Sequence, residues 1–87
     1  MSLVIKLVRH GESEANTGRI QAHEAGDFAI PLSERGREQA QAAGARIGRA
    51  FIEGALAYTS PYRRARETLS EILASCGLAP PSTPRGL

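Results

Sequence analysis

The sequence predicts an α/β fold in which parallel strands alternate with helices. Two short apolar runs, residues 3–8 and 56–59, have the composition of buried strands. Each run is followed by a loop and then by a stretch whose apolar residues recur at helical spacing. The order strand, loop, helix, strand, helix is that of two β-α units with right-handed crossovers. Two strands leave faces and edges uncovered, so we expect an architecture that is incomplete.

Length and composition limit the classes of protein to which this chain can belong. The 87 residues fit one small domain or part of a larger one, with 41% apolar and 23% charged residues. A single cysteine, Cys76, excludes an intramolecular disulfide, and no apolar run is long enough for a membrane span. We therefore expect a cytoplasmic protein with no membrane partner. The 11 basic and 9 acidic residues are interspersed, which argues against nucleic acid as a partner.

The first predicted strand, Leu3 to Val8, is almost continuously apolar, which suits a strand buried on both faces of a parallel sheet. Arg9 to Gly11 then leave the strand. A long connection follows from Glu12 to about Leu32 and shows neither helical nor strand periodicity. Long loops in compact domains are often functional.

The first predicted helix begins at Ser33, a good N-cap residue, with Glu34 in the first turn. Gly54 is a plausible stop, so the helix should run over residues 34–53. Its glycines lower helix propensity, although Gly44 and Gly48 lie one turn apart and would allow close packing against a sheet. Its apolar face consists of Ala40, Ala43, Ile47, Ala50 and Phe51.

The second strand, residues 56–59, leads into a second helix, for which Ser60 and Pro61 are suited as N-cap and first residue. Gly77 should end this helix. Three prolines after it should keep the tail extended. The apolar face of the helix consists of Ala65, Leu69, Ile72, Leu73 and Cys76.

Residues suited to phosphate chemistry follow both predicted strands. His10 comes directly after the first strand and Arg64 shortly after the second, and ligands of open α/β sheets bind beyond these strand ends. An unprotonated imidazole nitrogen of His10 can attack phosphorus, while Arg9 and Arg64 can bind phosphoryl oxygens. Phosphoryl transfer depends mainly on positioning and electrostatics, so this chemistry needs no metal or cofactor.

Each of these residues also has a structural interpretation. A lone histidine after a strand is usually structural, but the string Arg-His-Gly-Glu at a strand end favours chemistry here. Arg63 and Arg66 flank Arg64, so at least one arginine of this run should be only a surface charge. Ser13 and Asn16 can hydrogen-bond a substrate or, equally, cap turns of the loop.

Three segments, residues 7–16, 30–40 and 58–68, resemble the signature segments of the histidine phosphatase superfamily, also called the phosphoglycerate mutase-like family. The resemblance covers nearly the whole chain. It implies a three-layer fold with a mostly parallel sheet, of which the chain holds the opening two β-α units. It also implies that His10 becomes phosphorylated and that Arg9 and Arg64 hold the phosphate. By position, Asn16 borders the phosphate pocket and Ser13 lies where some mutases contact substrate.

Details of the resemblance favour a phosphatase over a mutase. Ser60-Pro61-Tyr62 and Ile30-Pro31 are more similar to the broad-range acid phosphatase branch than to the glycolytic mutases. Ala22 stands where mutases usually carry glycine. We keep phosphoglycerate mutase-type transfer as the alternative. The expected ligand is a small phosphorylated substrate or inorganic phosphate.

The family's later general acid and second pocket histidine have no counterpart in residues 1–87. The resemblance therefore implies the N-terminal portion of one histidine phosphatase domain. We expect little or no turnover from this chain by itself, and a non-catalytic phosphate-binding fragment is a second alternative. We also expect association with a second copy, which would cover an open sheet edge.

Overall fold

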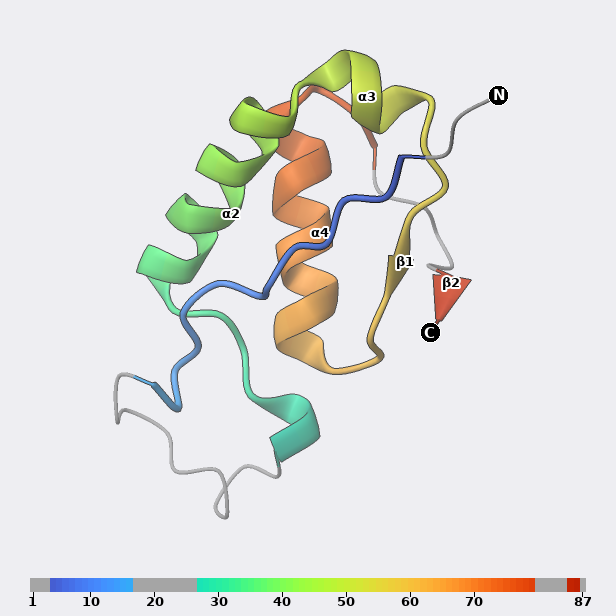
Figure 1. The fold of residues 1–87 in the computed structure, drawn as a ribbon. Helices are drawn as coiled ribbons and strands as arrows, with labels where there is room; N and C mark the ends of the chain where they lie inside the picture. The colour runs from blue at the N-terminus through green and yellow to red at the C-terminus, as the bar shows by residue number, and fades with distance from the viewer. Residues whose placement is uncertain (1–3, 17–26, 80–84, 87) are drawn as a thin grey trace.

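The computed structural model describes residues 4–16, 27–79 and 85–86. Ala22 and the three tail prolines lie outside the described residues. Two long helices pack side by side and form the main layer, while the N-terminal segment and the short strands lie over one face of it (Figure 1). The elements are η1 (Asp27–Ala29), α2 (Glu34–Ile47), α3 (Arg49–Glu53), β1 (Tyr58–Thr59), α4 (Arg63–Ser75) and β2 (Arg85–Gly86).

Helix α2 begins as the sequence predicts and ends earlier. The Ser33 hydroxyl accepts a hydrogen bond from the Gly36 N–H at 3.1 Å, which confirms Ser33 as the N-cap. The single helix predicted over residues 34–53 is wrong, because Gly48 has a φ of +90° and separates α2 from α3. Glycine adopts this left-handed conformation without the steric cost that a Cβ atom imposes.

Gly44 sets how closely α2 and α4 approach. A Cβ atom on Gly44 would lie 2.9 Å from the carbonyl oxygen of Ile72 and would also meet the Ser75 hydroxyl. The Cys76 thiol donates a hydrogen bond to the Gly44 carbonyl oxygen at 3.6 Å. The close packing predicted for Gly44 therefore exists, but against a helix and not against a sheet. Gly48 has no such contact, since a Cβ atom there would meet nothing within 4 Å.

Strand β1 is shorter than predicted and pairs in parallel with β2, with Tyr58 opposite Arg85. Helix α4 begins at Arg63 with Tyr62 as N-cap, so the predicted start at Ser60 and Pro61 is two residues early. The Ser60 hydroxyl instead accepts a hydrogen bond from the Tyr62 N–H at 3.3 Å and shapes the turn before the helix. The helix ends at Ser75, close to the predicted stop at Gly77, which has a φ of +72°.

The N-terminal segment, residues 4–10, is extended but forms no strand, so the predicted strand over residues 3–8 is wrong for the described residues 4–8. A strand needs a neighbour to bond its backbone groups, and the described pairing of β1 is with β2. Burial on both faces is wrong as well, because the side chains of Val4, Ile5 and Leu7 are 61%, 71% and 94% exposed.

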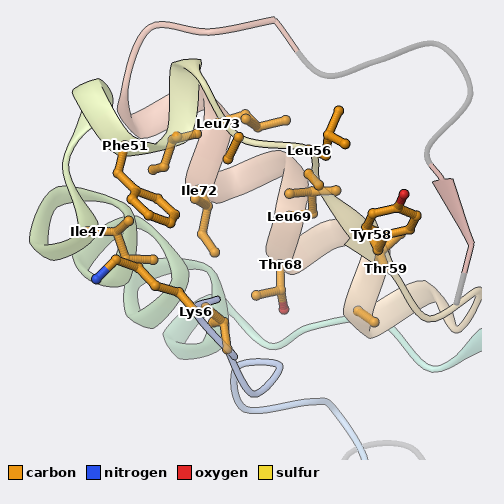
Figure 2. A pocket seen from close by; sticks show the side chains of 15 residues that line it. Lys6, Ile47, Phe51, Leu56, Tyr58, Thr59, Thr68, Leu69, Ile72 and Leu73 are labelled. Carbon is orange, nitrogen blue, oxygen red and sulfur yellow. The ribbon is translucent and has the colours of Figure 1, made fainter. Parts of the chain in front are cut away.

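An apolar hollow lies between the N-terminal segment and β1, above α4 (Figure 2). Its volume is about 190 Å³, and its walls include Val8 of the segment, Phe51 of α3 and Ile72 of α4. The Lys6 ammonium lies 5.0 Å from the centre of the Phe51 ring. This hollow separates the N-terminal segment from β1, the strand beside which the sequence places that segment.

In the described part of the chain, no helix is long and apolar enough to cross a membrane.

Candidate active site

A hollow of about 350 Å³ brings together residues from both ends of the predicted site. His10 stands at the end of the N-terminal segment, Ser60 and Tyr62 form the turn after β1, and Arg64 lies in the first turn of α4. The remaining wall is Ala65. The structure thus places His10 and Arg64 at one hollow, at the position where the predicted strand ends meet. His10 is exposed, so its ring is accessible to a ligand.

One ring nitrogen of His10 has a backbone partner. His10 Nδ1 lies 2.7 Å from the carbonyl oxygen of Gly11. A carbonyl oxygen only accepts hydrogen bonds, so this geometry assigns the proton to Nδ1. In the neutral ring Nε2 then carries the lone pair, and Nε2 is the atom suited to attack phosphorus.

Arg64 is held against an aromatic pair. The Cζ atom of its guanidinium lies 4.8 Å from the centre of the Tyr62 ring. Tyr62 packs in turn against Phe28 of η1, with ring centres 5.4 Å apart and planes tilted by 52°. Stacking of a guanidinium on an aromatic face is favourable and limits the orientations of the arginine. Arg64 therefore reaches the hollow from a supported position.

Arg9 lies elsewhere. It lines a separate hollow of about 420 Å³ together with residues of α2, among them Ala43 and Arg46. Leu7 and Val8 line that hollow as well, whereas His10 does not. The structure does not bring Arg9 to the hollow of His10 and Arg64, and its contact with phosphate stays a prediction.

Ser13 and Asn16 bond to each other. The Asn16 side-chain oxygen accepts from the Ser13 N–H at 2.9 Å and from the Ser13 hydroxyl at 3.1 Å. Ser13 is only 3% exposed and forms an antiparallel bridge with Leu32. Neither side chain lines the hollow of His10. These atoms stabilise a local turn, and a substrate contact by either residue stays a prediction.

The sequence profile of the histidine phosphatase superfamily (branch 1) matches residues 5–87. The chain belongs to this superfamily. Its fold is α/β, so the predicted fold class is confirmed at that level. The search of solved structures returned no significant match.

Curated relatives carry mutase names. A phosphoglycerate mutase-like protein of Arabidopsis thaliana is 41% identical over 75 residues, covering 78% of this chain and 24% of the relative. A 2,3-bisphosphoglycerate-dependent phosphoglycerate mutase of Hamiltonella defensa is 46% identical over 67 residues, covering 77% of this chain and 26% of the relative. A protein of the same name from Brucella abortus is 39% identical over 77 residues, covering 88% of this chain and 36% of the relative. The chain thus spans about a quarter to a third of the length of these relatives.

Two glycines in the segments that resemble the superfamily's signature touch each other. A Cβ atom on Gly11 would lie 2.9 Å from the Cα atom of Gly36, and one on Gly36 would meet the backbone of Glu12. The Ser33 N–H donates to the Glu12 carbonyl oxygen at 2.8 Å beside this contact. Gly36 therefore lets α2 approach the His10 segment. From the sequence, Gly36 was expected to lower helix propensity and to belong to the signature-like segment 30–40, but its contact with the backbone of Glu12 was not predicted.

Thr68 is a second residue that the sequence analysis missed. It is 6% exposed on α4, and its hydroxyl contacts both the Gly11 N–H and the Arg64 carbonyl oxygen. Its place at the end of the third signature-like segment, residues 58–68, is the signal that could have drawn attention to it.

Over residues 4–16, 27–79 and 85–86, no group of three or more His, Cys, Asp or Glu side chains is placed to hold a metal ion.

Proposed function

We propose that a protein carrying this chain transfers the phosphoryl group of a small phosphomonoester through His10. The observation that carries the proposal is the shared hollow of His10 and Arg64, which are far apart in sequence. An accessible imidazole beside a guanidinium pairs a nucleophile with a group that binds phosphoryl oxygens. Membership of the histidine phosphatase superfamily supports the same chemistry.

The reaction has two steps. His10 Nε2 attacks phosphorus, a nitrogen–phosphorus bond forms, and the phosphorus–oxygen bond to the leaving group breaks. The leaving oxygen takes a proton from water or from a carboxylic acid. The signature-like segments assign no residue of this chain as that acid. Water then attacks the phosphohistidine, the nitrogen–phosphorus bond breaks, and inorganic phosphate leaves with the imidazole restored. Arg64 stabilises the charge on the phosphoryl oxygens in both steps.

Hydrolysis of a generic aryl phosphate by the protein that carries this chain tests this proposal. We expect His10→Ala to lower kcat by roughly 10³-fold or more, because removal of a nucleophile disables the whole catalytic unit. Arg63→Ala is the matched control, since Arg63 bonds Glu67 on the exposed side of α4 and should retain nearly full activity. Equal hydrolysis by wild type and His10→Ala would exclude His10 as the nucleophile.

A mutase is the second candidate, and the names of the relatives from Hamiltonella and Brucella favour it. In a mutase the phosphoryl group moves from His10 to a hydroxyl of a phosphoglycerate instead of to water. The two candidates differ in the fate of the phosphoryl group. Label from a phosphorylated donor should appear in inorganic phosphate for a phosphatase, and in bisphosphoglycerate or isomerised phosphoglycerate for a mutase.

A further inference from the structure

The hydroxyl of Thr68 joins the two sides of the candidate site. The Gly11 N–H donates a hydrogen bond to Thr68 Oγ1 at 3.2 Å, and Thr68 Oγ1 donates one to the carbonyl oxygen of Arg64 at 2.7 Å. Gly11 directly follows His10, and Arg64 lies one helical turn before Thr68 in α4. Figure 2 shows the Thr68 side chain on the face of α4 that looks toward the N-terminal segment.

The N-terminal segment is held by contacts of the residues at its end. Residues 4–10 take part in no strand, so no ladder of backbone hydrogen bonds fixes them against the described strands. The contact between Gly11 and Gly36 fixes the segment against α2. The hydrogen bond to Thr68 fixes it against α4, the helix that carries Arg64.

Thr68 itself is well held. Its side chain is buried, and its hydroxyl uses its single proton toward α4 while accepting from the segment. Thr68 does not line the hollow of His10 and Arg64. It can therefore act on a ligand only through the residues it positions.

We propose that Thr68 is a positioning residue that sets His10 against Arg64, and thereby the affinity of the hollow for a phosphoryl group. This inference rests on the proposed function, because it takes His10 and Arg64 as the phosphate-binding pair. Small displacements of such a pair weaken its joint action on a ligand, so loss of the hydroxyl should weaken binding while the chain stays folded.

The test uses two variants that differ in whether they keep the hydroxyl. Thr68→Val keeps the shape of the side chain and removes the hydroxyl, whereas Thr68→Ser keeps the hydroxyl. Inorganic phosphate is titrated into each protein, and the NMR signals of the His10 ring report binding. We expect Thr68→Val to raise the Kd for phosphate about tenfold, because one buried hydrogen bond is lost. Thr68→Ser retains that hydrogen bond, so its Kd should stay within about twofold of wild type. Ser70→Ala, at an exposed position of the same helix, should leave the Kd unchanged.

A second measurement separates positioning from folding. Hydrogen exchange of the Gly11 amide should be faster in Thr68→Val and near the wild-type rate in Thr68→Ser. Unchanged phosphate affinity in folded Thr68→Val overturns the inference. If Thr68→Val does not fold, Thr68→Ser decides, because a folded Thr68→Ser chain that loses phosphate binding also overturns it.

Failure of the proposed function has a different signature. If phosphate leaves the His10 signals of wild type unchanged, the proposed site is wrong and the role of Thr68 falls with it. A different outcome is that wild type binds phosphate, that Arg64→Ala weakens this binding, and that Thr68→Val does not. In that case the proposed function stands, and only the role of Thr68 is wrong.

Discussion

Three neighbouring arginines at the start of α4 have three different partners. Arg63 bonds the Glu67 carboxylate at 3.4 Å, and Arg66 donates to the Pro61 carbonyl oxygen at 2.9 Å. Arg64 stacks on Tyr62 beside His10. At least one arginine of this run was expected from the sequence to be a surface charge, and the exposed ion pair of Arg63 with Glu67 fits that expectation. Arg64 is the member of the run that lines the His10 hollow.

Substitution of single arginines therefore separates phosphate binding from surface charge. We expect Arg64→Ala to weaken phosphate binding by about tenfold or more, because charge-assisted hydrogen bonds to a phosphoryl group are lost. Arg63→Ala removes the same charge one residue away and should change the affinity by about twofold at most. Isothermal titration calorimetry measures both values. Equal losses in the two variants would mean that Arg64 acts only through net charge.

For single residues, the sequence predicts which side chains lie close together where a general rule of topology applies to them. His10 and Arg64 were expected in one crevice because each follows a predicted strand. The structure puts them in one hollow, although the described residues 4–8 form no strand. Arg9 was expected with them, but it lines a separate hollow beside α2. Thr68 could not be found this way, because its hydrogen bond with the Gly11 N–H exists only once the N-terminal segment lies against α4.

The contact between α2 and α4 is the main contact between elements, and Gly44 lies within it. We expect Gly44→Ala to lower the free energy of unfolding by about 1–3 kcal/mol, because the added methyl group would overlap Ile72 and Ser75. Gly54→Ala is the matched control, since a Cβ atom there meets nothing within 4 Å. Urea unfolding followed by circular dichroism compares the two. A Gly44→Ala protein as stable as the control would show that the helices can move apart at little cost.

Helix ends were easier to predict than strands. Ser33 as N-cap and a stop near Gly77 depend on local chemistry, which the sequence contains. The break at Gly48 depends on a positive φ, and nothing in the spacing of the glycines distinguishes Gly48 from Gly44, which stays helical. The predicted strand over residues 3–8 failed because a strand depends on its neighbours, which local sequence does not specify.

For the whole molecule, the notable feature is an exposed apolar edge. Large apolar side chains of the N-terminal segment and of the stretch leading into β1 are more than half exposed; they include Val4, Ile5, Leu7, Leu56 and Tyr58. An extended apolar segment with unpaired backbone groups is a template for pairing with another chain. We propose that the 87-residue chain associates with a second copy through this edge.

Substitution at the edge tests self-association. We expect Leu7→Lys to shift the protein toward monomer, because the 94% exposed Leu7 would be replaced by a charge that opposes edge-to-edge pairing. Ala45→Lys adds the same charge at an exposed position of α2 and should leave the association unchanged. Sedimentation velocity over a range of concentrations measures the difference. Wild type that is monomeric at every concentration would contradict the proposal.

If His10 accepts a phosphoryl group from a substrate, that group can be detected on the protein itself. The protein is mixed with an aryl phosphate, quenched at alkaline pH to preserve phosphohistidine, digested, and analysed by mass spectrometry. We predict an acid-labile phosphoryl group on the peptide that contains His10, absent from His10→Ala. Phosphate binding by the same protein with no phosphoryl group on His10 would contradict this role of His10 and would favour a hollow that binds phosphate without turnover.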